Sequence, residues 1–170
     1  NKDAIITIVG YPKDVEEVYL SQEGIINSAS QNSYLIDMTT TTPTLSVKIH
    51  EEAKKKNLKA LDAPVSGGDI GAKNATLSIM VGGEKEDFEA CKKLFEAMGK
   101  TIVYAGNAGS GQHTKMANQI AIAGVMAGVS EAIAYGKKMG LDIPTMLASI
   151  SNGAAQSFHL TNNAPKMYKR

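Results

Sequence analysis

Short apolar runs alternate with amphipathic helical patterns over the first two thirds of the chain. Residues between the runs repeat apolar side chains at helical spacing, as in Pro12–Leu20, Pro43–Lys56 and Glu84–Met98. This alternation predicts βαβ units and a largely parallel sheet. The runs with strand character are Ala4–Val9, Tyr34–Met38, Leu58–Ala63, Thr76–Val81 and Thr101–Tyr104.

The first apolar run also predicts a position in the sheet. Ala4–Val9 is almost continuously apolar, which is expected of a central strand covered on both faces. A chain rarely begins with a strand of that kind. We therefore expect this sequence to be an internal part of a longer parent protein.

The pattern changes to all-helical after Gly111. Gln112 to about Met139 is free of proline and has an unbroken helical composition, and residues 116–130 carry no charge. A helix that is apolar nearly all round is expected to be buried. Pro144–Ser151 and Phe158–Tyr168, the latter interrupted near Pro165, predict further helices.

The predicted fold class is thus α/β followed by all-α. Residues 1–108 are expected to form the C-terminal part of a Rossmann-like, mostly parallel sheet. Residues 109–170 are expected to form the start of an all-helical domain, beginning with a long buried helix. This domain would bind the substrate and mediate oligomerisation.

Composition and charge exclude several classes of function. The formal net charge is +1 and the densest basic run is Lys54-Lys55-Lys56, so nucleic-acid binding is unsupported. The charge-free stretch Met116–Ser130 is too short and too polar to span a bilayer. Cys91 is the only cysteine, which fits a reducing, cytoplasmic compartment. The three histidines are isolated, so no metal site is predicted.

Two strand ends carry small or hydroxyl-bearing residues, at the edge where open parallel sheets bind ligands. Val9, Gly10 and Tyr11 would let a flat ring or a ribose approach the backbone, although a plain turn explains them equally well. Thr39 and Thr40 could offer hydroxyl groups to a ligand. Taken alone, the threonine run is better explained by helix capping, which Thr42 before Pro43 would supply.

A third strand end, at residues 62–72, is rich in glycine. Gly67, Gly68 and Gly71 follow a strand closely, and their exposed backbone N–H groups would suit a carboxylate or a phosphate. Ser66 adds a hydroxyl group but has no histidine and aspartate companions at the spacing of a hydrolase triad. The alternative is a long flexible connector, and the concentration of glycines favours a binding loop.

The start of the long helix groups three polar side chains on one face. Asn118 and Gln119 follow Lys115 at i+3 and i+4 in an otherwise apolar helix, and the alternative is an exposed stripe. The helix dipole disfavours a charged lysine there by only about 0.3–1 kcal/mol, which is less than one pKa unit of about 1.36 kcal/mol. Burial would have to lower its pKa further before it could exchange a proton with an alcohol.

These residues together resemble the signatures of a known family, the β-hydroxyacid dehydrogenases. The family includes 3-hydroxyisobutyrate dehydrogenase, tartronate semialdehyde reductase and 6-phosphogluconate dehydrogenase. The likeness runs through essentially the whole sequence. The matching segments are Asp62-Ala63-Pro64-Val65-Ser66-Gly67-Gly68, then Gly71-Ala72, Thr76-Leu77 and Met80-Val81-Gly82-Gly83, then Gly109-x-Gly111-x-x-x-Lys115-x-x-Asn118-Gln119, and Asp37-Met38-Thr39-Thr40 with Pro43.

The resemblance implies an oxidoreductase that moves a hydride between NAD or NADP and a small hydroxy acid or semialdehyde. It implies a homo-oligomer, a dimer or tetramer joined through the helical part. Gln119 beside Asn118 is more similar to the tartronate semialdehyde branch. The implied roles are general acid/base for Lys115, substrate holding and support of Lys115 for Asn118, substrate binding for Ser66, Gly67, Gly68 and Gln119, and the nicotinamide side of the cofactor site for Val9, Gly10, Tyr11 and Thr40.

The sequence also departs from the family pattern. Ala75 stands where glycine is common, and no G-x-G-x-x-G motif follows a first strand. The residue that separates NAD from NADP and the helices that complete the substrate pocket are also missing from the sequence. Two alternatives therefore stay open: a catalytically inactive fragment, or a non-enzymatic nucleotide-binding or oligomerisation protein of the same fold.

Overall fold

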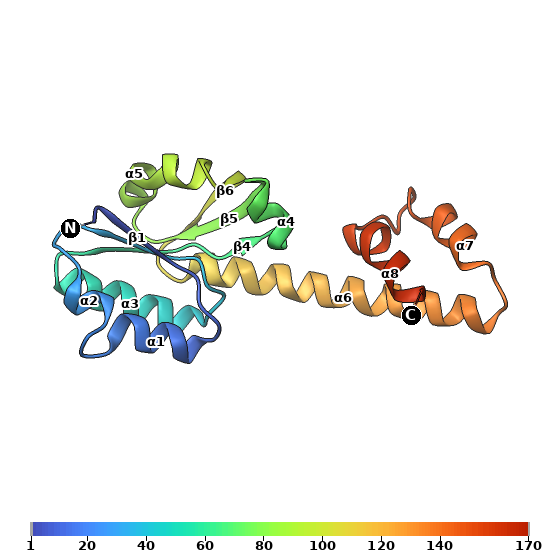
Figure 1. The fold of residues 1–170 in the computed structure, drawn as a ribbon, viewed down its shortest axis with the longest axis horizontal. Helices are drawn as coiled ribbons and strands as arrows, with labels where there is room; N and C mark the ends of the chain where they lie inside the picture. The colour runs from blue at the N-terminus through green and yellow to red at the C-terminus, as the bar shows by residue number, and fades with distance from the viewer. Residues whose placement is uncertain (1, 170) are drawn as a thin grey trace. The chain divides into compact units, whose positions relative to one another are not determined.

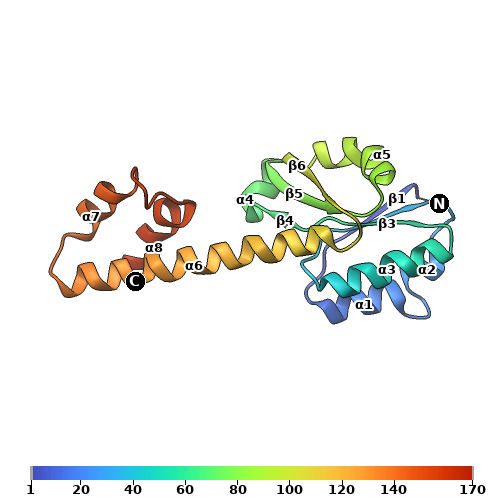
Figure 2. The ribbon, with the colours of Figure 1, turned by 180° about the vertical axis from the view of Figure 1, so that it is seen from behind.

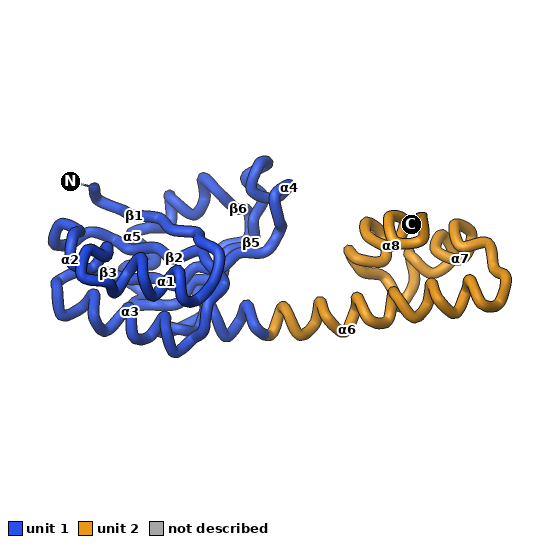
Figure 3. Tube along the Cα trace, turned by 60° about the horizontal axis from the view of Figure 1, so that its bottom comes forward, with its two compact units in different colours: residues 1–116 blue, residues 117–170 orange. Residues whose placement is uncertain are grey.

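The computed structural model describes residues 2–169, which fall into two compact units. The first unit ends at Met116 and the second begins at Ala117, as the two colours of Figure 3 show. The change from α/β to all-helical composition occurs in the same region of the chain. The fold class predicted from the alternation of patterns is confirmed.

The first unit is built on one mixed sheet. Its strand order is β1-β2-β3-β5-β4, with β6 beside β5. The pairs β1–β2, β2–β3 and β5–β6 are parallel, whereas β5 runs antiparallel to β3 and β4. The strands are β1 (Ala4–Thr7), β2 (Tyr34–Asp37), β3 (Lys59–Asp62), β4 (Val65–Ser66), β5 (Leu77–Gly82) and β6 (Gly99–Gly106).

Helices cover both faces of this sheet (Figures 1 and 2). One face is covered by α1 (Pro12–Leu20), α2 (Ile25–Ser28) and α3 (Pro43–Lys55), and the other by α5 (Lys85–Glu96). Successive strand residues point to opposite faces. Leu35 accordingly packs in the core with α1 and α3, and Ile36 packs in the core with α5.

The predicted element boundaries agree closely with the structure where local chemistry sets them. Thr42 is the N-cap of α3, and its Oγ1 accepts a hydrogen bond of 3.3 Å from Leu45 N. The short elements α2, β4 and α4 (Gly68–Lys73) were not predicted. The glycine-rich segment at residues 62–72 is therefore a short strand and a helix, not a flexible connector.

The prediction of a central first strand is wrong for this chain. Among the described residues β1 pairs only with β2, so it lies at the edge of the sheet. The side chains of Ile6 and Ile8 are 42% and 69% exposed. The apolar run correctly indicated a strand, but the number of its neighbours depends on tertiary pairing that the run does not encode.

The second unit is helical. It consists of most of α6 (Ser110–Lys138), α7 (Ile143–Ile150), a π-helical turn (His159–Asn163) and α8 (Ala164–Tyr168). The helix predicted at Phe158–Tyr168 is divided at Ala164, and Pro165 lies in the first turn of α8. The apolar core of the second unit consists of Val129, Ile133, Ile143, Leu147, Leu160 and Ala164.

The prediction that the long helix is buried is also wrong within this chain. Only 11% of the most apolar 18-residue window of α6 is buried, and Ile120 is 74% exposed. The short helices α7 and α8 pack on one side of its C-terminal half and leave the middle of the helix uncovered. With a mean hydropathy of 1.3, α6 is long and apolar enough to cross a membrane, but a single helix of this kind is weak evidence of a membrane span.

Candidate active site at the carboxyl edge of the sheet

The turns after β1 and β2 are joined at the carboxyl edge of the sheet. Val9 N donates a hydrogen bond of 3.0 Å to Thr39 Oγ1. Thr39 is buried, whereas Gly10, Tyr11 and Thr40 are exposed. The structure therefore brings the four residues predicted for the nicotinamide side, Val9 to Tyr11 and Thr40, onto two adjacent turns.

A network of buried and half-buried polar side chains lies next to these turns and bonds to the turn after β2. Asp37, the last residue of β2, accepts hydrogen bonds of 3.1 Å at Oδ1 from Thr39 N and from Thr7 Oγ1. The Tyr19 hydroxyl lies 2.7 Å from Thr7 Oγ1. Burial raises the pKa of Asp37 above its ordinary value, and burial together with the nearby Asp37 carboxylate raises the pKa of Tyr19.

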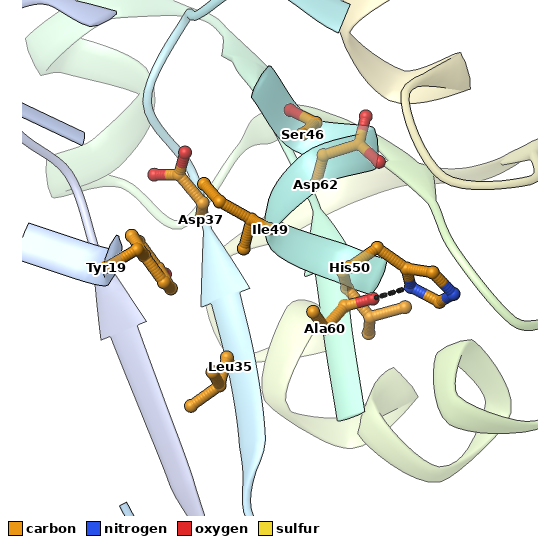
Figure 4. A pocket seen from close by; sticks show the side chains of 9 residues that line it. Tyr19, Leu35, Asp37, Ser46, Ile49, His50, Ala60 and Asp62 are labelled. Carbon is orange, nitrogen blue, oxygen red and sulfur yellow. Dashed lines mark hydrogen bonds between the residues drawn. The ribbon is translucent and has the colours of Figure 1, made fainter. Parts of the chain in front are cut away.

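A small cavity lies beside this network and is shown in Figure 4. Two polar atoms of its lining residues, Asp37 Oδ2 and Ser46 Oγ, are buried and have no hydrogen-bond partner within residues 2–169. Its volume of about 10 Å³ is the space needed by one water molecule. The cavity is too small for a hydroxy acid or a nicotinamide ring, so neither ligand can bind inside it.

Asp62, at the end of β3, caps the long helix from a different part of the chain. Its Oδ1 accepts a hydrogen bond of 2.8 Å from Gly109 N, and its Oδ2 accepts one of 2.9 Å from Gln112 N. Gly109 directly precedes α6 and Gln112 lies in its first turn, where backbone N–H groups lack partners within the helix. Burial raises the pKa of Asp62 above its ordinary value, although the hydrogen bonds from the two N–H donors tend to lower it.

Gln112 adds a second link between α6 and the strand ends. Its side chain is completely buried; Nε2 donates to Thr39 O at 2.7 Å, and Oε1 accepts from Thr41 N at 3.0 Å. No role was predicted for Asp62 beyond its place in a motif, and none for Gln112. Their polar side chains among apolar neighbours were the available signal.

Lys115 lies one turn further along α6 and is only 8% exposed. Its Nζ donates a hydrogen bond of 2.7 Å to Val65 O in β4, directly before Ser66. Burial lowers the pKa of Lys115, and no charged partner among the described residues opposes that shift. The structure therefore brings Lys115 next to the segment that carries Ser66, Gly67 and Gly68.

Gly67 and Gly68 adopt backbone conformations that favour glycine. Their φ angles are 131° and 62°, and they form the turn between β4 and α4. A Cβ atom at Gly68 would meet no other atom within 4 Å, so the backbone is accessible there. Ser66 is half-buried in β4, with Lys115 bonded to the residue before it.

Asn118 and Gln119 lie beyond the end of the first unit. Asn118 is one turn after Lys115 along α6, and its Nδ2 donates to Gln119 Oε1 at 3.4 Å. Asn118 is half-buried and Gln119 is exposed. Within residues 2–169 the side chains of His, Cys, Asp and Glu form no group of three or more that could hold a metal ion.

Two family models match the chain over almost its whole length. Residues 1–106 match the NAD binding domain of 6-phosphogluconate dehydrogenase. Residues 109–170 match the NAD-binding region of NADP-dependent 3-hydroxyisobutyrate dehydrogenase. The first match alone covers more than half of the chain.

Individual proteins are similar to the chain over the same extent. An uncharacterized oxidoreductase of Bacillus subtilis, YkwC, is 64% identical over 97% of this chain and 57% of its own length. The 2-hydroxy-3-oxopropionate reductase of Escherichia coli is 38% identical over 99% of this chain and 58% of its own. The structure of Mycobacterium tuberculosis 3-hydroxyisobutyrate dehydrogenase with L-serine superimposes with a TM-score of 0.85 at 29% identity, covering 96% of this chain and 55% of that one. The chain thus spans little more than half the length of these relatives.

Proposed function

The chain belongs to the β-hydroxyacid dehydrogenase family, and from this we propose that the protein transfers a hydride between NAD or NADP and a small hydroxy acid. We assign the proton transfer to Lys115. The observation that carries this assignment is the buried amine of Lys115, hydrogen-bonded to Val65 O beside the Ser66-Gly67-Gly68 segment.

The residues at the carboxyl edge fit the nicotinamide end of such a cofactor. Gly10 and Thr40 are exposed on neighbouring turns, where a flat ring could approach the backbone and a hydroxyl group could reach a ribose or an amide. Val9, Gly10, Tyr11 and Thr40 would hold that end. The sequence contains no G-x-G-x-x-G motif, so these residues account for the nicotinamide end and not for the pyrophosphate.

In the oxidation direction, the neutral amine of Lys115 takes the proton from the substrate hydroxyl. A nicotinamide held by Val9, Gly10, Tyr11 and Thr40 would supply the acceptor for the hydride that leaves the carbinol carbon, and in its reduced form the donor for the reverse direction. Val65 O orients the amine, because it occupies one of the positions around Nζ and leaves the others to the substrate. Ser66, Gly67 and Gly68 bind the substrate carboxylate, and Asn118 and Gln119 hold the substrate beside Lys115.

Replacing the amine tests this assignment. In the complete polypeptide, Lys115→Met should lower kcat by about 10²–10⁴-fold, the usual contribution of a general acid/base, while nucleotide binding persists. Lys92→Met, which makes the same change on an exposed face of α5, is the control. Turnover is measured from the absorbance of the reduced nicotinamide, and unchanged turnover in Lys115→Met would refute the role.

We propose 3-hydroxyisobutyrate or tartronate semialdehyde as the type of substrate. Support comes from relatives named for these two reactions and from Gln119 beside Asn118. Comparison of kcat/KM for the two substrates with each nucleotide would separate the branches and the cofactor preference. A chain that binds nucleotide but neither oxidises 3-hydroxyisobutyrate nor reduces tartronate semialdehyde would favour the binding-protein alternative.

We further propose a cytoplasmic homo-oligomer, a dimer or tetramer, that associates through the helical part. Residues 1–108 would bind the cofactor and residues 109–170 would serve substrate and assembly. Exposed apolar side chains on α6, among them Ile120 and Tyr135, support an interface there. Sedimentation of the complete polypeptide without detergent tests the assembly: a monomer, or a protein extracted only with detergent, would contradict it.

A further inference from the structure

Gln112 connects two parts of the site that are far apart in the sequence. Its side-chain amide bonds to the main chain of Thr39 and Thr41 in the turn after β2, while its own backbone belongs to the first turn of α6. Both bonds are buried. The turn contains the proposed cofactor residue Thr40, and the helix carries Lys115.

The primary amide of Gln112 suits both of its backbone partners. Thr39 O needs a donor and Thr41 N needs an acceptor, and a glutamine amide offers one of each. A hydrocarbon chain of the same length would leave both buried groups unpaired, and a carboxylate would face the carbonyl oxygen of Thr39 with another acceptor. The arrangement therefore requires a side chain with one donor and one acceptor, which glutamine supplies without a change of protonation.

The connection continues on both sides of Gln112. Thr39 Oγ1 accepts from Val9 N, so the turn after β1 is linked to the turn after β2. On the other side, Gln112 N donates to Asp62, and Lys115 follows one helical turn later. A shift of Gln112 would thus change the position of the cofactor-side turns relative to the amine.

We propose that Gln112 is a positioning residue that holds the Thr39–Thr41 turn, and with it the nicotinamide side of the site, at a set distance from Lys115. The proposal rests on the proposed function for its catalytic meaning. It predicts that loss of the amide loosens the turn and slows turnover while Lys115 itself remains in place.

Hydrogen exchange of the complete polypeptide without ligand tests whether the Gln112 side chain holds the Thr39–Thr41 turn. In Gln112→Met the amide of Thr41 loses its acceptor, so a peptide covering Met38–Thr42 should exchange roughly fivefold to tenfold faster, the effect of losing one net hydrogen bond. Peptides from α5 should exchange as in the wild type. Gln22→Met makes the same change at an exposed position and should leave the turn unaltered. Unchanged exchange of the Met38–Thr42 peptide in Gln112→Met would overturn the proposal.

Gln112→Glu provides a second test that does not depend on the folding of Gln112→Met. A neutral glutamic acid repeats the donor and acceptor of glutamine, whereas its carboxylate cannot donate to Thr39 O. Burial and the neighbouring Asp62 carboxylate should raise the pKa of the new group. Exchange of the turn and kcat should therefore approach wild-type values as the pH falls, with little change in the KM of the hydroxy acid. A Gln112→Glu defect that does not depend on pH would overturn the proposal.

Hydrogen exchange of the turn and enzymatic turnover together separate this proposal from the proposed function. If the turn loosens in Gln112→Met but the wild type shows no dehydrogenase activity with either nucleotide, the link is supported and the proposed function fails. If the wild type is active and Gln112→Met turns over at the same rate, the positioning role fails and the proposed function stands.

Discussion

Asp62→Ala should destabilise the first unit by much more than the loss of an ordinary helix cap. The carboxylate accepts two backbone hydrogen bonds, of 2.8 Å from Gly109 N and 2.9 Å from Gln112 N. Both bonds are buried, so the two N–H donors are shielded from bulk water. The substitution leaves two N–H groups unpaired at the start of α6.

The magnitude follows from these two donors. An unpaired buried N–H group costs about 1–3 kcal/mol, so two of them cost about 2–6 kcal/mol. Part of this loss is offset, because burial raises the pKa of Asp62 and its charged form is thus itself disfavoured in the folded protein. We expect a net loss of roughly 2–4 kcal/mol in the free energy of unfolding, a large part of a total of about 5–15 kcal/mol.

Thr42→Ala is the matched comparison within the same unit. Thr42 is exposed and its Oγ1 caps α3 with a single bond from Leu45 N, so its loss should cost about 1 kcal/mol. Urea unfolding can be followed by hydrogen exchange in peptides from β2 and β3, which report on the first unit alone. If Asp62→Ala costs no more than Thr42→Ala, the inference that Asp62 anchors α6 is refuted.

Three further perturbations follow from the same geometry. Because burial lowers the pKa of Lys115, kcat/KM for hydroxy acid oxidation should rise with pH and level off below the ordinary lysine pKa of about 10.4, and a profile still rising there would contradict the assignment. Burial raises the pKa of Asp37, so the free energy of unfolding should fall as the pH rises through that raised pKa. Urea titrations should show a smaller fall in Asp37→Asn, where Asp62, whose pKa burial also raises, still contributes; a fall of unchanged size would contradict the assignment to Asp37. Gly111→Ala would place a Cβ against two backbone carbonyl oxygens and should cost more than about 2 kcal/mol in a urea titration, whereas Gly124→Ala in the same helix meets nothing and should stabilise by up to about 1 kcal/mol.

Elements whose ends are set by local chemistry could be predicted from the sequence. Thr42 followed by Pro43 supplies an N-cap and a first-turn proline, and α3 begins there. The alternation of apolar strands with amphipathic helices predicted parallel pairing, which β1, β2 and β3 show. In each case the information lies within a few residues of the feature.

Features that depend on distant partners could not be predicted in this way. The antiparallel placement of β5 against β3 and β4 depends on which strand edges remain free after the other strands pair. Asp62 and Gln112 are both polar residues next to apolar segments, but their hydrogen bonds reach 50 and 71 residues along the chain. Periodicity indicates that such residues are buried, and it does not indicate which backbone groups they satisfy.

The chemistry assigned to Lys115 depends on the same distant contacts. The helix dipole at its position is too weak to lower its pKa far, and burial of the side chain lowers it. Its hydrogen-bond partner, Val65 O, is a neutral backbone atom, so it can fix the direction of the amine without the strong preference for the charged form that a carboxylate would impose. Asp62 fixes the start of α6 and thereby fixes where Lys115 lies relative to the sheet. The strand β4 fixes the position of the acceptor, Val65 O. The amine that we propose as the proton-transfer group is therefore tuned by the packing of the helix start against the strand ends. A change that loosens this packing should affect both the stability of the protein and the pH dependence of the proposed reaction.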